Sequence, residues 1–286
     1  MKKISRRSFL AAAGLSVAAL ALTACGGSSA STASSVASSA ASSVASSAAS
    51  SEAVSSAAAA ELATVEAGKL TMATNATFPP YEMTTDSGEI EGIDVDTAKA
   101  IAEKLGLELQ IDDMEFDAAL LSVQQGKADI VMAGVTVTDE RKAVMDFSDS
   151  YATGIQSIIV PNDSDIASPD DLAGKKIGTQ RGTTGYIYCS DDFGEDSVVA
   201  YDSGLTAVQA LNNGQVDAVV IDNAPATEYV AANPGLKVLD TSYAEEDYAI
   251  GMAKGSALED AVNKALEELK ADGTLQAIVD KYINAN

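Results

Sequence analysis

One structural pattern occurs twice in this chain, in the same order, and it constrains the possible folds more than any other feature. Each copy consists of an amphipathic helical segment, a Gly-x-x-Asp motif and a short apolar run. The motifs occupy residues 126–129 and 214–217, and the apolar runs after them occupy residues 130–133 and 218–221. Glycine favours the left-handed conformation that ends a helix, and short apolar runs are typical of buried parallel strands. The repeat therefore predicts an α/β fold with two lobes of similar topology.

The beginning of the chain predicts an export signal and a lipid anchor. Basic residues precede the apolar stretch 9–24, which is shorter than the about 20 residues that a helix needs to span a bilayer. The stretch ends in Leu22-Thr23-Ala24-Cys25, which resembles the bacterial lipobox, where the signal is cut before a cysteine that becomes lipidated. We therefore expect a lipoprotein signal peptide at 1–24 and a diacyl anchor on Cys25, sufficient for stable membrane attachment. Residues 5–10 resemble a twin-arginine export motif, but Sec signals also carry paired arginines, so both routes stay open.

A low-complexity segment follows Cys25. From residue 28 to residue 60 the chain is almost wholly Ser and Ala, with a recurring unit of four residues. Such a segment has too little apolar bulk to offset the entropy lost on ordering. We therefore expect a flexible linker at 25–65, which carries a folded domain at 66–286 on the outer face of the cytoplasmic membrane.

The composition excludes several classes of chemistry. The formal net charge of −24 repels nucleic acid, so we expect no nucleic-acid partner. The chain contains no histidine, which excludes Ser-His-Asp and Cys-His catalysis and every His-ligated metal site. We expect no catalytic residue, no metal and no cofactor.

Candidate binding residues follow the predicted strands of the first lobe, because ligands bind beyond the carboxyl ends of parallel strands. The loop after the apolar run 70–73 carries Asn75, Phe78 and Tyr81. The two aromatic rings either form a wall of a pocket or belong to the core, and the spacing alone favours neither.

The loop after the run 130–133 carries Gly134, Thr136 and Arg141. The guanidinium of Arg141 is a planar donor group suited to a carboxylate, and Thr136 adds a hydroxyl and a backbone N–H. The alternative role for Arg141 is a surface salt bridge to Asp139 or Asp146.

The second lobe offers a matching set. Gln180, Thr183 and Thr184 lie in a glycine-containing loop that opens a predicted helix, where free N–H groups favour an anion. This loop matches neither common nucleotide-binding motif. Asp222 ends the run 218–221, where its carboxylate can meet an ammonium group. Together with Arg141, these groups form the complement of an amino-acid zwitterion.

Several motifs resemble the polar-amino-acid substrate-binding proteins of ABC importers, the bacterial extracellular solute-binding proteins of family 3. The resemblance covers residues 66–283, and its motifs are Phe78-Pro79-Pro80-Tyr81, Gly92-Ile93-Asp94-Val95-Asp96, Gly126-Lys127-Ala128-Asp129, Thr138-Asp139-Glu140-Arg141, Asp146-Phe147-Ser148, Asp171-Leu172-Ala173-Gly174-Lys175-Lys176 and Gly182-Thr183-Thr184.

The resemblance implies the two-lobed periplasmic-binding-protein-like fold of type II, with the ligand in the cleft. Two hinge crossings, near 151–154 and 244–248, join lobe 1 (66–152 plus 247–286) to lobe 2 (153–246). The implied function is capture of a free amino acid outside the cell and delivery to a transmembrane permease. The protein would be a monomer and not an enzyme.

The resemblance also implies roles for individual residues. Arg141 and the backbone N–H groups of Thr136 and Thr183 hold the ligand carboxylate. Asp222, the carbonyl of Gly134 and the hydroxyl of Thr136 hold the ammonium group. Phe78 and Phe116 enclose the side chain, and Asn75 and Gln180 lie near its tip.

The expected ligand is polar and uncharged. Family members that bind basic ligands tend to have an acid near the position of Asn75, and some relatives have a lysine at the position of Gln180. Amides at both positions favour an uncharged side chain. A hydrophobic, sulfur-containing or cationic ligand remains an alternative, because Glu82, Glu115 or Asp117 can reach the pocket.

Two other functions use the same fold. A sensor that signals to a membrane partner would have the same pocket. Dehydratases that act on cyclic amino acids need a positioned acid or base, and the sequence singles out no carboxylate for that role.

Overall fold

The computed structural model describes residues 62–283. The predicted signal peptide, Cys25 and the predicted linker up to residue 61 lie outside the described residues. Within residues 62–283, no helix combines the length and the apolar character that crossing a membrane requires.

The first of two large sheets has the strand order β5-β1-β6-β14-β7. Its strands β5, β1 and β6 are parallel, and β14 runs antiparallel to β6 and to β7. The strands are β1 (Lys69–Thr74), β5 (Glu108–Asp113), β6 (Ile130–Val131), β7 (Met145–Phe147) and β14 (Gly251–Ala253), and the accompanying helices are α1 (Ile93–Leu105), α2 (Phe116–Gln124), α3 (Asp139–Val144), α7 (Glu259–Ala271) and α8 (Thr274–Ile283).

The second large sheet has the order β10-β9-β11-β8-β12, with β13 also paired to β8. Its strands are β8 (Ala152–Pro161), β9 (Ile177–Gln180), β10 (Val198–Tyr201), β11 (Ala218–Asp222), β12 (Leu236–Val238) and β13 (Ala244–Tyr248), and its helices are α4 (Thr184–Phe193), α5 (Gly204–Asn212), α6 (Asn223–Ala232) and the short 3₁₀ turns η1 (Pro169–Leu172) and η2 (Glu195–Ser197). A small third sheet consists of β2 (Thr77–Phe78), β3 (Glu82–Thr84) and β4 (Ile90–Glu91).

The two large sheets repeat one topology, which confirms the prediction from the sequence repeat. The order β5-β1-β6 followed by the antiparallel β14 corresponds to β10-β9-β11 followed by the antiparallel β8. Parallel strands β1 and β9 occupy equivalent central positions. Their carboxyl ends, together with those of β6 and β11, are where the predicted binding residues begin.

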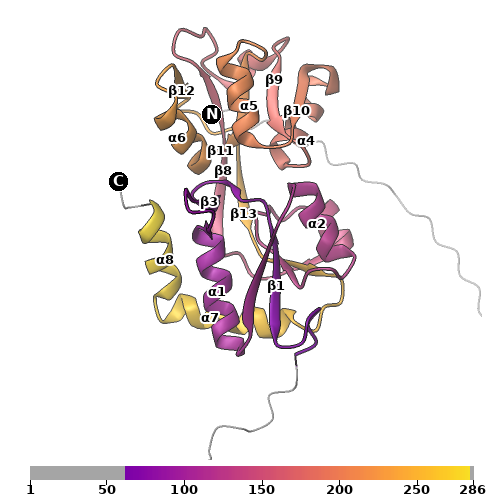
Figure 1. Cartoon of the computed structure of the whole chain (residues 1–286). Helices are drawn as coiled ribbons and strands as arrows, with labels where there is room; N and C mark the ends of the chain where they lie inside the picture. Colours follow the sequence, from indigo (N-terminus) through magenta and orange to yellow (C-terminus); the bar gives the residue numbers. More distant parts are fainter. Residues whose placement is uncertain (1–61, 284–286) are drawn as a thin grey trace, which may run out of the picture. The chain divides into compact units, whose positions relative to one another are not determined.

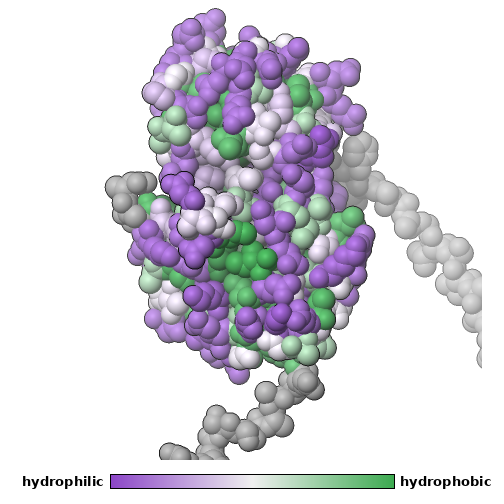
Figure 2. All heavy atoms as spheres, viewed as in Figure 1, coloured by the Kyte–Doolittle hydropathy of each residue, from purple (hydrophilic) through white to green (hydrophobic). Residues whose placement is uncertain are grey.

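Each large sheet buries side chains on both faces, because successive residues of a strand point to opposite sides. In β1, Leu70 and Met72 belong to the core under α1 and α7, whereas Ala73 belongs to the core under α2. In the second sheet, Ile159 lies in the core with residues of α5 and α6, and Ile158 lies in the core that contains Cys189 of α4. On the face drawn in Figure 2, hydrophilic residues predominate and the larger hydrophobic patches lie over the lower half.

The Gly-x-x-Asp motif joins each copy of the repeat to the neighbouring parallel strand, at β1 in the first sheet and just before β9 in the second. Oδ2 of Asp129 accepts a hydrogen bond from the backbone N–H of Thr71 at 2.7 Å, and the N–H of Asp129 donates to the Thr71 carbonyl at 2.9 Å. Asp217 makes the same reciprocal pair with Lys176, at 2.8 Å in both directions. The glycines of the motifs, Gly126 and Gly214, have φ of 65° and 67°, as the left-handed helix end requires.

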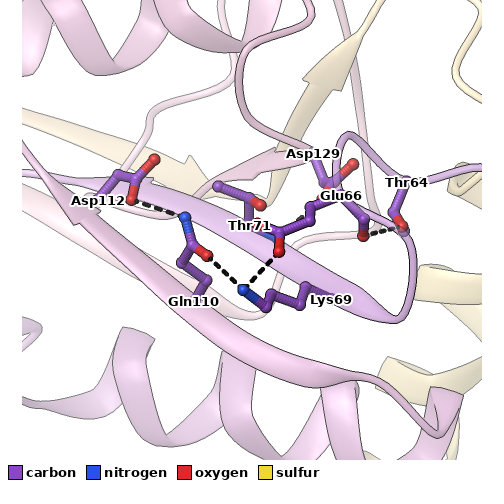
Figure 3. A network of polar contacts seen from close by, with 7 residues as sticks. All are labelled: Thr64, Glu66, Lys69, Thr71, Gln110, Asp112 and Asp129. Atoms are coloured by element: carbon purple, nitrogen blue, oxygen red, sulfur yellow. Dashed lines mark hydrogen bonds and ion pairs between the residues drawn. The ribbon is translucent and has the colours of Figure 1, made fainter.

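Further polar contacts surround the start of β1 (Figure 3). Lys69 forms an ion pair with Glu66 at 2.6 Å and donates to Gln110 of β5 at 3.3 Å. Oδ1 of Asp129 accepts from the N–H of Val65 at 2.7 Å. These contacts fix the register between the first described residues and the sheet.

Two strands connect the sheets. The chain leaves the first sheet after β7 and enters the second through β8, and it returns through β13 into β14. Strands β8 and β13 are antiparallel, with Tyr248 opposite Ala152, and they run between the upper and lower groups of elements in Figure 1. The expected two-lobed type II fold with two crossings is therefore confirmed.

The predicted elements agree closely with the observed ones, with one correction. The apolar runs expected as strands at 70–73 and 218–221 lie within β1 and β11. The strand expected at 130–133 is shorter, because β14 pairs only with Ile130 and Val131. The chain then turns toward the cleft at Gly134, whose φ is 54°.

Candidate functional site

A small pocket lies between the two large sheets, and both contribute to its walls. The carboxyl ends of β1, β6, β9 and β11 bring their following loops to it, as expected for parallel strands. Its lining consists of Asn75, Phe78, Glu82, Phe116, Ala133, Gly134, Thr136, Arg141, Gln156, Gln180, Thr183, Thr184, Ile221, Asp222 and Tyr248.

The structure brings together every predicted site residue except Tyr81. The Tyr81 ring lies behind the pocket wall, stacked on Phe78 at 5.8 Å between ring centroids and edge-on to Tyr248 at 5.4 Å. Tyr81 is a core residue of the first large sheet and supports Phe78 from behind. The ligand roles of the other residues remain predictions.

Arg141 of α3 is held as a buried cation. Its Nη1 donates to the carbonyl of Thr136 at 2.7 Å, and its Nη2 donates to the carbonyl of Gly182 at 3.1 Å. Its guanidinium carbon lies 5.4 Å from the centroid of the Phe116 ring. Burial lowers the pKa of Arg141, and the charge of Glu246 opposes this effect. Asp146, proposed as an alternative partner of Arg141, instead pairs with Lys254 at 2.6 Å.

Asp222, at the end of β11, places a buried carboxylate in the same pocket. Its Oδ2 accepts from the N–H of Ile155 at 2.7 Å, and its Oδ1 accepts from the N–H of Ala224 at 2.9 Å, where it caps α6. Burial raises the pKa of Asp222 to about 6, although these two hydrogen bonds act in the opposite direction. The carboxylate is therefore poorly solvated, and a cationic group from a ligand would stabilise its charge.

The start of α4 contributes backbone donors and two threonines. Thr183 is the N-cap of α4, and its hydroxyl donates to the Gln180 carbonyl at 2.8 Å. Thr184 is the first residue of the helix, and its side chain is buried at the pocket. The first N–H groups of a helix lack intrahelical partners and favour an anion.

A pair of acidic residues, Asp94 and Glu82, borders the pocket from the side of the first sheet. Oδ2 of Asp94 accepts from the N–H of Gly134 at 3.0 Å, which orients the peptide that follows β6. Burial raises the pKa of Asp94 to about 6. Burial and the adjacent Asp94 also raise the pKa of Glu82 well above its usual range, and Glu82 lines the pocket. Glu82 reaches the pocket as foreseen, whereas Glu115 and Asp117 do not belong to its lining.

Sequence reasoning missed the contributions of β8 and β13. Gln156 and Tyr248 line the pocket from these strands, and Glu246 lies directly behind them. Gln156 had a detectable signal, because its amide side chain lies within the mainly apolar strand β8. Glu246 and Tyr248 had none, since no motif surrounds them.

The arrangement serves binding. Among residues 62–283, no group of Cys, His, Asp and Glu is placed to hold a metal ion. A cation from one sheet and a carboxylate from the other face a small polar pocket with aromatic walls. Two α/β lobes with two crossing strands and such a pocket define a two-lobed binding protein for a small polar solute.

Comparison with known proteins identifies the family. The model of the bacterial extracellular solute-binding proteins, family 3, matches residues 70–285, and the chain belongs to this family of amino-acid-binding proteins of ABC transporters. It is an extracellular solute-binding protein and not an enzyme.

Relatives and solved structures support this assignment. The chain is 33% identical over 225 residues to the L-cystine-binding protein TcyJ of Escherichia coli K12, with 77% of this chain and 85% of TcyJ covered. It is similar in structure to the arginine-, lysine-, histidine-binding protein ArtJ of Geobacillus stearothermophilus, with a TM-score of 0.73 and 35% identity over 76% of this chain and 96% of ArtJ. An ancestral arginine-binding protein bound to glutamine matches with a TM-score of 0.71 and 42% identity, over 76% of this chain and 99% of that protein.

Proposed function

We propose that this protein captures a free, polar, uncharged amino acid and delivers it to the transmembrane permease of an ABC importer. The observation that carries this proposal is the pairing of Arg141 and Asp222, opposite charges that line one pocket from the two sheets. A zwitterion satisfies both groups at once, whereas an anion or a cation without the second charge leaves one of them buried without a partner. Lobe 1 (66–152 plus 247–286) and lobe 2 (153–246) close around the ligand, and the protein acts as a monomer.

The proposed assignment within the pocket follows the two charges. Arg141 takes the ligand carboxylate together with the N–H groups of Thr136 and Thr183. Asp222 takes the ammonium group together with the carbonyl of Gly134 and the hydroxyl of Thr136. Phe78 and Phe116 enclose the ligand side chain, with Asn75 and Gln180 near its tip.

The preference for an uncharged side chain is supported by the amides of Asn75 and Gln180, which line the pocket and hydrogen-bond to each other. A neutral amide pair offers no counter-charge to an ionic side chain.

A cationic amino acid is the second candidate, because Glu82 also lines the pocket. A cationic ligand group would favour the ionised form of Glu82, and the lining would then carry two carboxylates, Glu82 and Asp222, against the single guanidinium of Arg141. ArtJ is named for arginine, lysine and histidine, and the ancestral arginine-binding protein holds glutamine, so close relatives take both kinds of ligand.

Thermal melting against the twenty standard amino acids, cystine, ornithine and citrulline tests the proposal. A ligand at a thousand times its Kd adds about 4 kcal/mol to the unfolding free energy. For a domain of this size each kcal/mol raises Tm by roughly 2–4 °C. Arginine and citrulline are nearly isosteric, and only the side chain of arginine is charged. A larger shift with citrulline supports the uncharged ligand, and a larger shift with arginine supports the second candidate.

Two arginine variants test the site. Arg141→Ala should abolish the shift of the best amino acid, because it removes a charge-assisted hydrogen bond of about 1.5–3 kcal/mol and leaves a buried carboxylate unpaired. Arg181→Ala is the matched control, since Arg181 is exposed, pairs with the exposed Asp202 at 3.7 Å and donates to the Ala200 carbonyl at 3.4 Å. Full binding by Arg141→Ala would refute the assignment.

We also propose that Cys25 carries the lipid anchor, although it lies outside the described residues. Cys25→Ser should release the protein from the membrane fraction of producing cells into the medium. Cys189→Ser is the control, because Cys189 is buried in the domain. Membrane retention of Cys25→Ser would contradict the anchor.

A further inference from the structure

A buried carboxylate on the returning strand lies behind the pocket wall. Glu246 belongs to β13, one of the two strands that connect the sheets, and its side chain is almost completely buried, with a relative exposure of 6%. Its neighbours in the strand, Glu245 and Asp247, are exposed. A charge buried at this position needs compensating hydrogen bonds.

Glu246 receives those hydrogen bonds from the pocket lining itself. One oxygen, Oε2, accepts from the hydroxyl of Thr136, from the amide of Gln156 and from the hydroxyl of Thr184, each at 3.0 Å. Thr136 follows β6 of the first sheet, and Thr184 begins α4 beside the second sheet. The two hydroxyl oxygens are 3.4 Å apart. One carboxylate oxygen therefore holds a hydroxyl from each side of the pocket.

The direction of these hydrogen bonds determines what the hydroxyls can offer a ligand. A threonine hydroxyl has one proton and two lone pairs. When that proton goes to Glu246, only lone pairs remain for the pocket. Both threonines are then acceptors toward the ligand, which favours a donor such as an ammonium group over a carboxylate.

We propose that Glu246 is a positioning residue of the binding site, which commits the hydroxyls of Thr136 and Thr184 to accept hydrogen bonds from the ligand ammonium group. The inference rests on the proposed function and extends it to a residue that does not line the pocket. Glu246 also adds negative potential next to Arg141 and Asp222, since its charge acts on the pKa of both. The ammonium end of the site is thus formed by Asp222 directly and by Glu246 through the two threonines.

A matched pair of variants separates this role from a general effect of charge. Glu246→Gln removes the charge and leaves a single amide oxygen, which can accept from the hydroxyls only as a neutral and weaker acceptor. Glu245→Gln removes the same charge from the adjacent, exposed position of the same strand. The probe is the amino acid that gives the wild-type protein its largest thermal shift, and Kd is measured by titration calorimetry at pH 7. Glu246→Gln should raise Kd by about tenfold or more, the effect of a charged hydrogen bond, and Glu245→Gln should leave it within about twofold.

A double-mutant cycle tests whether the effect passes through the hydroxyls. Glu246→Gln should cause a smaller fold-increase in Kd in a Thr136→Val background than in the wild type, by a factor of about three or more. The reason is that one of the oriented hydroxyls is already absent from that background. Thr136→Ser retains the hydroxyl and should retain the full effect of Glu246→Gln. A purely structural role of Glu246 would give the same fold-change in all three backgrounds, and this result would overturn the inference.

The remaining outcomes are also decisive. If Glu246→Gln does not fold, as judged by its melting curve, the cycle is carried out with Glu246→Asp, which keeps the charge but withdraws it by one methylene from the hydroxyls. If the Kd of either variant lies within about twofold of that of the wild type, the inference about Glu246 is overturned and the proposed function still stands. If the wild type responds to no amino acid, the proposed function fails first, and the inference fails with it.

Discussion

The side-chain nitrogen of Gln180 lies 2.8 Å from the side-chain oxygen of Asn75, which links the end of β9 to the loop after β1. Both side chains are buried. The Asn75 oxygen Oδ1 also accepts from the Thr77 hydroxyl at 3.0 Å, and the Asn75 Nδ2 donates one hydrogen to the Met114 carbonyl at 2.9 Å. A neutral amide therefore joins the two lobes at one end of the pocket.

Changing Asn75 to aspartate should shift the preference toward cationic ligands. The new carboxylate would face the Met114 carbonyl without a donor, at a cost of about 1–3 kcal/mol in the unfolding free energy. A guanidinium can supply the missing donor, so the ratio of the Kd for citrulline to the Kd for arginine should rise. Titration calorimetry with both compounds measures it. Asn162→Asp is the control, since the exposed Asn162 also donates to a backbone carbonyl, that of Pro234 at 2.8 Å. An unchanged ratio would separate Asn75 from ligand choice.

Ligand affinity should depend on the ionisation of Asp222. The pKa of this carboxyl is raised to about 6 by burial, and a ligand ammonium group binds the ionised form more tightly. Proton release therefore accompanies binding, and affinity should rise about tenfold between pH 5 and pH 7. Asp222→Asn should bind more weakly at pH 7 and lose this dependence, as measured by Kd across that range. Asp217→Asn, which alters an exposed Asp far from the pocket, should keep it. A steep profile in Asp222→Asn would assign the proton to another group.

The predictable part of this structure is local in origin. The repeat could be found because a glycine end, an aspartate and an apolar strand are adjacent in the sequence. Arg141 and Asp222 could be placed in one pocket because the carboxyl ends of parallel strands meet at one edge. The hydrogen bond between Asp129 and the backbone of Thr71 could not be predicted, because no sequence pattern marks Thr71 as its partner.

The unpredicted part arises from long-range register. Glu246 lies opposite Gly154 because β13 pairs with β8, and this pairing joins segments about ninety residues apart. A shift of one residue in such a pair would turn Glu246 to solvent and bury Glu245. The position of Tyr81 could not be predicted from the sequence for the same reason, because the pairing of β2 with β3 decides which aromatic ring faces the pocket.

Glu82→Gln should remove a pH dependence of stability. Burial and the adjacent Asp94 raise the pKa of Glu82, so the folded protein retains a proton that the unfolded chain releases. Its contribution to stability is complete below the unfolded pKa of about 4.3 and is lost as the pH rises through the folded pKa. Glutamine cannot ionise, so the unfolding free energy of Glu82→Gln should fall less than that of the wild type between pH 5 and pH 8. Denaturant unfolding measures this, with the exposed Glu89→Gln as control. Parallel curves for Glu82→Gln and the wild type would contradict the assignment.

Gly182→Ala should weaken binding by disturbing the contact between the lobes. Gly182 has φ of +73°, and a Cβ there would lie 1.6 Å from Oδ1 of Asp117 in α2. Its carbonyl also accepts from Arg141. Gly174→Ala is the control, because Gly174 has φ of +75° and no heavy atom within 4 Å of a new Cβ. Both variants should lose about 1–2 kcal/mol of stability from backbone strain. Only Gly182→Ala should also raise Kd, by about tenfold or 1.4 kcal/mol. Equal Kd values for the two variants would mean that Asp117 moves aside freely and that the Gly182 carbonyl does not position Arg141.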